Sequence, residues 1–323
     1  MNYNLLKGTN IFVSSIGFGT WGIGGPTLAS QAYGYKDRET SIKALLKAKE
    51  KGINFYDTAS SYGEAEVLLG EVFQNNRKEI VISTKGGYRE NFVAGGTNQD
   101  FGSVHIESSI LRSLARLKTD YIDIYHLHDC PLSEIKNNPK LFDMLTNYRK
   151  SEIIKAIGFS GKSSLDTIEA LDIFPFDVIQ IGLSLVDMRP IIDGLIQKCI
   201  QRNISIIARS CLAFGFLTNE AKAGGFIDHR SKFSERQRKL WIACKELCTH
   251  IYHSDNGLKW SNKAINFALS CEGVSVVNIG MNNSRQVEEN IQSLDSTRLS
   301  SIQIGNLLEV YKFNYHNKVI ERQ

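Results

Sequence analysis

The stretch RETSIKALLKAKEKGINFYD, Arg38–Asp57, predicts the fold because it joins a helix to a strand that ends in a charged residue. Apolar Ile42, Leu45, Leu46 and Ala48 lie on one side of the predicted helix and charged residues on the other, which is the pattern of an amphipathic helix. The INFYD run that follows is short and rich in β-branched and aromatic residues, as buried strands are. The segment therefore predicts one helix-and-strand unit.

Eight strand-like runs of this kind occur along the chain. The predicted strands are Ser15–Gly19, Ile53–Asp57, Ile80–Thr84, Ile122–His128, Ile154–Phe159, Val178–Leu183, Ile204–Arg209 and Val274–Ile279. Helical patterns fit between most of them, so the sequence predicts a closed (β/α)8 TIM barrel, as a single domain over residues 1–323. An open doubly wound sheet would need a helix directly after its glycine-rich turn, and none opens after GFGTWGIGG, Gly17–Gly25.

Three segments fall outside the repeating pattern. Tyr3–Val13 predicts a small N-terminal β-hairpin at the floor of the barrel. Gly86–Ser103 is predicted to be a loop over the barrel mouth, and Ser210–Ala264 a long insertion between strands seven and eight. Within the insertion, Ser234–Ile251 and Leu258–Ser270 are expected to be helices.

The composition is that of an ordinary soluble enzyme. A net charge of +4 without a basic block argues against a nucleic-acid binder, and no run reaches membrane-spanning length. The start of the chain lacks the pattern of a secretory signal, and the six cysteines lack the spacing of a disulfide framework. We expect a cytoplasmic protein with reduced thiols.

Polar residues cluster at the carboxyl ends of the predicted strands, where barrel enzymes carry their active sites. They are Asp57, Lys85, His128, Ser160, Gln180, Arg209 and Ser210. Together with Tyr62, which follows Asp57 by five residues, Lys85 and His128 suggest acid catalysis on a carbonyl group. Lys85 is expected to lower the pKa of Tyr62 by stabilising its phenolate, Asp57 to hold Lys85, and His128 to orient the substrate oxygen.

Seven segments resemble those of the aldo-keto reductase family, in the family's order. They are GINFYDTASSYGEAEVLLGEVF, STKGGY, SLARLKTDYIDIYHLHD, IGFSGKSS, DVIQIGLSLVD, IIARSCLAFGFLT and IGMNNSRQVEEN. The resemblance implies an NAD(P)(H)-dependent oxidoreductase that transfers a hydride between nicotinamide and a carbonyl or alcohol substrate. Asp57, Tyr62, Lys85 and His128 match its catalytic positions.

The resemblance also implies the residues that bind the nucleotide. Ser160 and Gln180 would hydrogen-bond the carboxamide; Arg209, Ser210, Leu212, Gly215 and Leu217 would line the pyrophosphate loop; Gly280, Asn282, Arg285, Gln286 and Asn290 would lie toward the adenine end. Gly161 replaces the usual Asn, and Asn282 stands where many members carry an Arg for the 2′-phosphate. Because Arg285 offers a replacement charge, NADP(H) is favoured as cofactor and NAD(H) is possible.

The substrate is predicted to be a small carbonyl or alcohol compound, bound by a monomer or a homo-oligomer. Trp21, Tyr88 and Asp129 are the candidate substrate-binding residues. An Asp directly after the histidine resembles family members that act on sugars, which suggests a sugar or keto-sugar.

Two other functions fit parts of the pattern. His126 and His128 lie two apart on one strand and so share a face, which would suit a metal-dependent barrel hydrolase. The remaining histidines fall on predicted helices or loops, so this alternative lacks further ligands. The second alternative is a regulatory subunit that binds the nucleotide and turns over little substrate.

Overall fold

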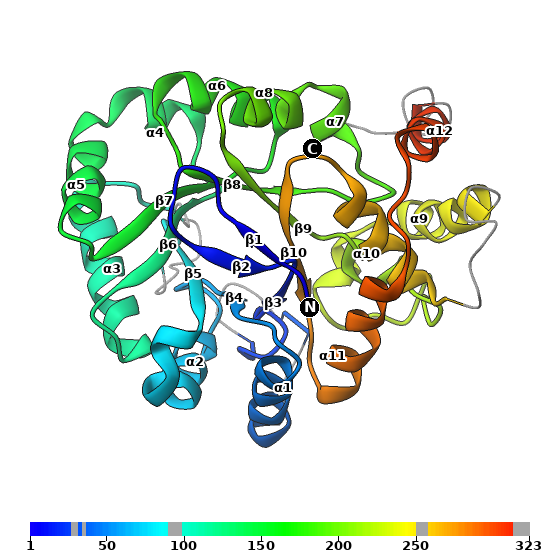
Figure 1. Ribbon diagram of the computed structural model, residues 1–323, viewed down its shortest axis with the longest axis horizontal. Coiled ribbons are helices and arrows are strands. Elements are labelled where there is room, and N and C mark those ends of the chain that lie inside the picture. Colours follow the sequence, from blue (N-terminus) through cyan, green and yellow to red (C-terminus); the bar gives the residue numbers. More distant parts are fainter. Residues whose placement is uncertain (27–31, 34–36, 90–98, 250–257, 313–323) are drawn as a thin grey trace.

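The computed structural model describes residues 1–26, 32–33, 37–89, 99–249 and 258–312. Eight parallel strands close into a barrel in the order β10-β3-β4-β5-β6-β7-β8-β9, and helices surround it (Figure 1). The barrel strands are β3 (Ile16–Gly19), β4 (Phe55–Asp57), β5 (Val81–Gly86), β6 (Ile122–His128), β7 (Ile154–Ser160), β8 (Val178–Gly182), β9 (Ser205–Arg209) and β10 (Val274–Gly280). The predicted (β/α)8 barrel is confirmed.

The helices follow the predicted alternation, with extra helices after β6, β8 and β10. They are α1 (Arg38–Glu50), α2 (Ala65–Phe73), α3 (Ser103–Leu117), α4 (Leu132–Asn137), α5 (Pro139–Lys150), α6 (Ser164–Ile173), α7 (Arg189–Ile192), α8 (Leu195–Gln201), α9 (Glu235–Cys248), α10 (Trp260–Ser270), α11 (Ser284–Ile291) and α12 (Ser301–Tyr311). In the described part of the chain, no helix is long and apolar enough to span a lipid bilayer.

Helix α1 shows how the local sequence sets an element. The Asp37 side chain caps its first turn by accepting a hydrogen bond from the backbone N–H of Thr40 at 2.7 Å. Leu45 and Ala48 are fully buried against the barrel, as predicted. Leu46 is 50% exposed, so its assignment to the apolar side was wrong. A residue directly after Leu45 is rotated by about 100° around the helix and points away from the barrel.

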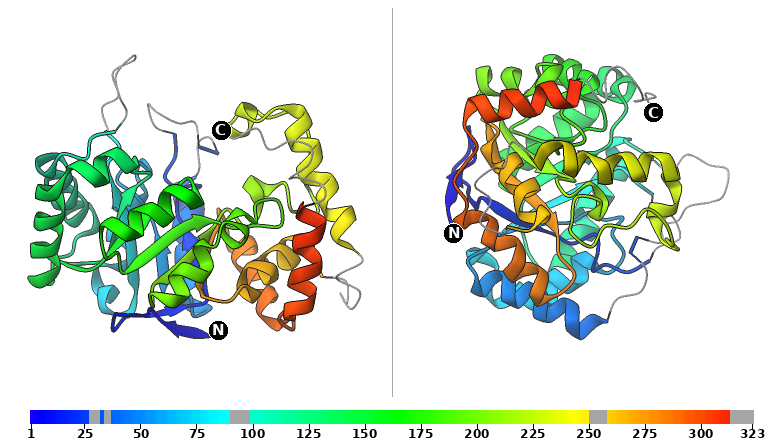
Figure 2. Two further views of the ribbon diagram at one scale, coloured as in Figure 1. Left: turned by 90° about the horizontal axis from the view of Figure 1, so that it is seen from above. Right: turned by 90° about the vertical axis from the view of Figure 1, so that its right-hand side faces the viewer.

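The predicted hairpin closes the amino-terminal end of the barrel. Strands β1 (Tyr3–Leu5) and β2 (Phe12–Ser14) pair antiparallel, and the left view of Figure 2 shows them in dark blue across one end. Buried Leu6, Ile11 and Val13 pack with the side chains that fill the lower interior of the barrel. The floor is therefore a hydrophobic plug.

The strand register brings the polar strand ends to one level at the opposite end. Asp57 is the register partner of Ser83, and His128 that of Ser160, which in turn pairs with Gln180. The insertion between β9 and β10 is present at this end, with α9 and α10 within a few residues of their predicted bounds.

Candidate active site

Asp57 is the centre of a buried hydrogen-bond network at the end of β4. Its Oδ1 accepts hydrogen bonds from Ser83 Oγ at 2.9 Å and Gln180 Nε2 at 2.8 Å. Its Oδ2 accepts from Lys85 Nζ at 2.7 Å and Asn278 Nδ2 at 2.8 Å. Four strands thus meet on one carboxylate, which ties the carboxyl ends of β4, β5, β8 and β10 together.

Lys85 forms a fully buried ion pair with Asp57. Its ammonium donates to Asp57 and to the Thr58 carbonyl, each at 2.7 Å. Burial lowers the pKa of Lys85, and the Asp57 charge opposes this shift. Burial alone would raise the pKa of Asp57, but the Lys85 charge and the hydrogen bonds it receives bring that pKa below its usual value. The Lys85 Nζ and the Asp57 Oδ2 lie 2.7 Å apart, so each group stabilises the charged form of the other.

Tyr62 lies in the loop after β4, above this ion pair. The Lys85 ammonium is 5.1 Å from the centroid of its ring, over the aromatic face. Burial raises the pKa of Tyr62 above its ordinary value of 10, and the Asp57 charge raises it further. The expectation that Lys85 lowers this pKa was wrong, because burial of the phenol raises the pKa, and the charge that opposes the shift is that of Arg209. Tyr62 is held as a protonated acid at neutral pH.

His128 ends β6 beside Tyr62, with 5.8 Å between the ring centroids. Burial lowers its pKa well below 6.5, and the Lys85 and Arg209 charges add to the shift. The imidazole is therefore neutral near pH 7, a state in which one ring nitrogen carries a proton that it can donate. Tyr62 and His128 present two hydrogen-bond donors to the same region.

His126 lies one layer deeper in the barrel interior, where it packs among the strands. Its Nε2 is 3.1 Å from Ser83 Oγ, and burial lowers its pKa to about 3. A Cβ atom at Gly158 would lie 2.2 Å from His126 Nδ1, so the glycine on the neighbouring strand makes room for the ring. Within the described ranges, no group of three His, Cys, Asp or Glu side chains gathers in a way that suits a metal ion.

The predicted substrate-binding residues gather around this centre. The Tyr88 ring lies 4.8 Å from that of His128, and its hydroxyl donates to Asp129 Oδ2 at 3.0 Å. The Trp21 ring lies 6.4 Å from that of Tyr62. All three predicted residues line one cavity of about 1030 Å³, which opens at the carboxyl ends of the strands.

Most of the predicted nucleotide-binding residues line the same cavity. They are Gln180, Arg209, Ser210, Leu212, Gly215, Gly280, Asn282, Arg285, Gln286 and Asn290. Ser160 and Leu217 are buried and are not among the residues that line it. Ser160 is buried behind Gln180, with its hydroxyl 3.4 Å from the Gln180 amide oxygen, and Leu217 packs into the core.

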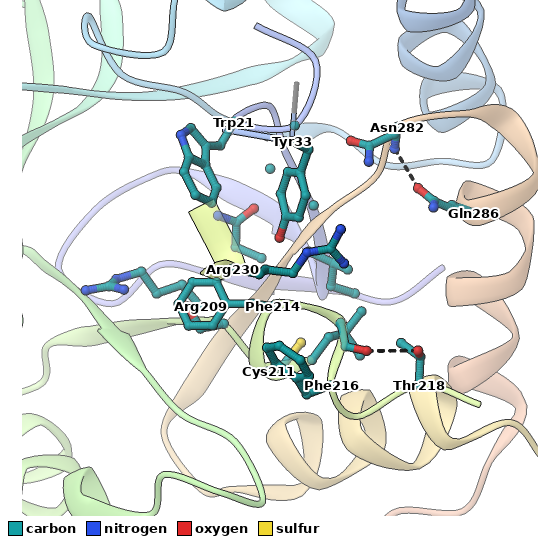
Figure 3. A pocket seen from close by; sticks show the side chains of 18 of the residues that line it. Trp21, Tyr33, Arg209, Cys211, Phe214, Phe216, Thr218, Arg230, Asn282 and Gln286 are labelled. Carbon is teal, nitrogen blue, oxygen red and sulfur yellow. Dashed lines mark hydrogen bonds between the residues drawn. The ribbon is translucent and has the colours of Figure 1, made fainter. Parts of the chain in front are cut away.

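The cavity fits an elongated anionic ligand such as a nicotinamide dinucleotide. Basic side chains along its wall (Lys162, Arg209, Lys222, Arg230, Lys232, Lys259 and Arg285) outnumber acidic ones (Asp57, Asp129, Glu220 and Glu289). The loop after β9 turns tightly through left-handed residues, among them Ser210 and Gly215, and forms one wall. The N-terminal turn of α11 forms another, where the backbone N–H of Asn282 donates to Gln286 Oε1 at 2.7 Å (Figure 3).

Several lining residues escaped the sequence analysis. Asn278 binds Asp57, and an amide within the buried VSVVNIG strand was the available signal. Figure 3 shows Arg230 and Phe214 of the insertion near Tyr33 and Trp21 of the loop after β3. Nothing in the sequence indicates that these two segments meet, because they lie about 200 residues apart.

The contact between these segments is made at His229, beside Trp21 and Tyr33 of the cavity wall. Its backbone N–H donates to the Ala32 carbonyl at 3.3 Å, and its Nδ1 lies 2.6 Å from the same oxygen. The ring packs 4.4 Å from Trp21 and 4.5 Å from Tyr33, measured between centroids. We call this contact the mouth bridge.

Comparisons with known proteins agree with this geometry. A model of the Aldo/keto reductase family matches residues 15–312. An uncharacterized oxidoreductase of Bacillus subtilis (strain 168) is 26% identical over 312 residues, which cover 95% of each chain. L-galactose dehydrogenase of Arabidopsis thaliana is 27% identical over 314 residues, covering 92% of this chain and 88% of that protein. The holo form of an aldo-keto reductase from Bacillus halodurans has a TM-score of 0.79 at 22% identity, covering 100% of this chain and 99% of that one.

Proposed function

Since a family model matches nearly its whole length, this chain belongs to the aldo/keto reductase family, and we propose that it interconverts a carbonyl and an alcohol group on a sugar or keto-sugar. Family membership makes the chain an NAD(P)-dependent oxidoreductase. The observation that carries the proposal is the placement of two hydrogen-bond donors, Tyr62 and His128, above the buried Asp57–Lys85 pair.

In the direction of reduction, Tyr62 acts as the general acid. A nicotinamide bound in the cavity would supply a hydride for the carbonyl carbon, and the phenol of Tyr62 would give its proton to the carbonyl oxygen. His128, neutral at this pH, donates a hydrogen bond to that oxygen and fixes its position. Lys85 lies close enough to stabilise the phenolate that remains, and Asp57 holds Lys85 in place.

Residues further along the cavity bind the rest of the nucleotide. We assign the carboxamide to Gln180, the pyrophosphate to the loop from Ser210 to Gly215, and the adenosine to Asn282 and Asn290. Arg285 lies 3.8 Å from Glu289, and Lys259 pairs with the same carboxylate at 2.7 Å. Their net positive charge supports NADP(H) as the favoured cofactor, with NAD(H) also accepted.

The test follows nucleotide absorbance while the protein is given aldehydes, ketones, aldoses and keto-sugars with each nucleotide. We expect turnover, and we expect Tyr62→Phe to lower kcat by about 10²–10⁴ without changing nucleotide affinity. Nucleotide binding without turnover on any substrate would identify a regulatory subunit instead. Wild-type turnover by Tyr62→Phe would remove Tyr62 as the acid.

A further inference from the structure

The side chain of Gln99 binds the backbone at the end of β6, although it belongs to the loop after β5. Its Nε2 donates hydrogen bonds to the carbonyl oxygens of His128 and Asp129, at 3.2 and 3.1 Å. The amino group of a carboxamide carries two protons, one for each carbonyl. One side chain thus satisfies two successive carbonyls, on His128 and on the residue that follows it.

The two carbonyls lie where the strand changes direction. The Asp129 N–H still donates to the Ser160 carbonyl at 2.8 Å, as a continuation of the pairing between β6 and β7. The Asp129 backbone is left-handed (φ 54°), which is unfavourable for a residue other than glycine and persists only where the surrounding structure holds it. Gln99 therefore holds the strand end at the residue where the backbone leaves the barrel.

The His128 ring depends on this backbone for its direction. In many enzymes a hydrogen bond at Nδ1 orients the catalytic imidazole. The Nδ1 of His128 is buried and has no hydrogen-bond partner among the residues that the structure describes. The rings of Tyr62 and Tyr88 flank the imidazole at 5.8 and 4.8 Å between centroids. Such ring contacts limit the space around the imidazole, so its direction follows from the backbone that carries it.

Gln99 is itself anchored to the end of β5. It pairs with Tyr88 in an antiparallel β-bridge, and the N–H of the next residue, Asp100, donates to the Gly87 carbonyl at 2.8 Å. Asp100 Oδ1 in turn accepts from the Gly102 N–H at 2.9 Å. The backbone of Gln99 is therefore fixed to β5, and its amide connects the end of β5 with the end of β6.

Gln99 does not line the cavity that contains Tyr62 and His128. It lines a second cavity of about 220 Å³, together with Asp129 and Cys130. Both protons of its amino group have backbone acceptors. An effect of this side chain on the reaction therefore passes through the strand end and not through contact with the substrate.

We propose that Gln99 is a positioning residue for His128, because its amide holds the carbonyls of His128 and Asp129 and so fixes the direction in which the imidazole enters the cavity. This inference rests on the proposed function, in which His128 orients the substrate oxygen. A misplacement of about 1 Å, caused by a mutation away from the reacting atoms, can lower the rate by about 100-fold. Loss of the amide should therefore slow the reaction and leave nucleotide binding unchanged.

The first experiment removes the two donors. Gln99→Met keeps the length of the side chain, and we expect it to lower the single-turnover rate by about 10- to 100-fold on the best carbonyl substrate. The nucleotide dissociation constant should equal that of the wild type. A wild-type rate would overturn the inference, and so would an equal loss of nucleotide affinity, which indicates a general disturbance of the barrel mouth. If the wild-type protein turned over no carbonyl compound with either nucleotide, the proposed function itself would be refuted.

A double-mutant cycle tests whether the effect passes through His128. In the His128→Ala background the imidazole is absent, so Gln99→Met should cause no further loss of the single-turnover rate. The same fold-loss in both backgrounds would mean that Gln99 acts independently of His128, and the inference would be wrong. A residue that only stabilises the fold gives this second result.

Gln99→Glu is a second variant of equal length. Its ionised carboxylate places oxygen atoms against two carbonyl oxygens, so we expect a loss at least as large as in Gln99→Met, and a wild-type rate would overturn the inference.

Arg89→Met is the matched control at the same position of the loop. The half-exposed Arg89 side chain pairs with Asp100 at 2.9 Å, next to Gln99. Its removal leaves the Gln99 amide in place, and the rate should equal that of the wild type. A loss as large as in Gln99→Met would show that the loop as a whole, and not the amide, positions His128.

Discussion

Removing Asp57 from the buried Asp57–Lys85 pair should destabilise the fold more than removing Lys85. Breaking a buried ion pair costs about 3–5 kcal/mol, because one charge is left without its partner. After Lys85→Met, the Asp57 carboxylate still accepts hydrogen bonds from Ser83, Gln180 and Asn278. Hydrogen bonds to a charged group contribute about 1.5–3 kcal/mol each. We therefore expect Lys85→Met to cost about 3 kcal/mol, the low end of the range for a broken ion pair.

The reverse change, Asp57→Leu, leaves more groups unsatisfied. Of its two hydrogen-bond partners among the described residues, the Lys85 ammonium keeps the Thr58 carbonyl, and the side chains of Gln180 and Asn278 lose their acceptor. We expect a cost of about 5 kcal/mol or slightly more. The part of this cost that comes from the unpaired charge has a ceiling, because Lys85 can lose its proton, and neutralising a lysine of pKa 10.4 at pH 7 costs about 5 kcal/mol.

The ceiling makes the stability of Asp57→Leu depend on pH. In this variant the folded state leaves Lys85 neutral while the unfolded chain binds the proton, so stability rises with pH by up to about 1.4 kcal/mol per unit below pH 10.4. Lys85→Met has no such dependence between pH 7 and 9. The double variant should cost less than the sum of the single ones, since it leaves neither charge unpaired.

Urea unfolding, followed by circular dichroism and by tryptophan fluorescence at pH 7 and pH 9, measures these differences as midpoint shifts at constant m value. An equal or larger cost for Lys85→Met would refute the reasoning. So would strict additivity in the double variant, because it would mean that the two charges do not interact.

Three further predictions concern other parts of the structure. Burial lowers the pKa of His126 to about 3, so the unfolded chain gains a proton first as the pH falls, and stability should drop by up to about 1.4 kcal/mol per unit below pH 6.5. Urea unfolding between pH 6.5 and 5 should show a shallower slope for His126→Gln, and an unchanged slope would contradict this. His229→Ala removes the side-chain part of the mouth bridge, worth about 2 kcal/mol, and should speed nucleotide release by roughly 30-fold in stopped-flow fluorescence. Nucleotide release from this variant as slow as from the wild type would show that opening of the mouth bridge does not control release. Asn282→Arg should tighten NADP(H) relative to NAD(H) by about 10- to 150-fold in equilibrium titrations, whereas the uncharged Asn282→Gln should not.

The barrel and its polar strand ends were predictable because they follow local rules. A buried strand is mostly apolar along its length, so an ionisable residue at its end, such as Asp57 or His128, stands out in the sequence. Parallel strands in one barrel bring those ends to one level. The sequence alone therefore indicated that these residues lie together.

The remaining features depend on contacts between distant segments. The pKa of Tyr62 is raised because the folded chain buries the phenol, and no sequence pattern reports how deeply a loop residue is buried. The contact of His229 with Ala32 and the contact of Asp129 with Arg209 depend on how separate loops fold over the mouth. Leu46 was misassigned because an apolar residue next to the buried face of a helix looks the same in the sequence as one within it.

The hydrophobic plug at the barrel floor has a kinetic consequence. With Leu6, Ile11 and Val13 filling the amino-terminal end, nucleotide and substrate share one entrance at the opposite end. The residues that we assign to the nucleotide and to the substrate line this one cavity. Whichever reactant arrives second obstructs the departure of the first. We therefore expect a compulsory order, in which the nucleotide is the first reactant to bind and the last product to leave.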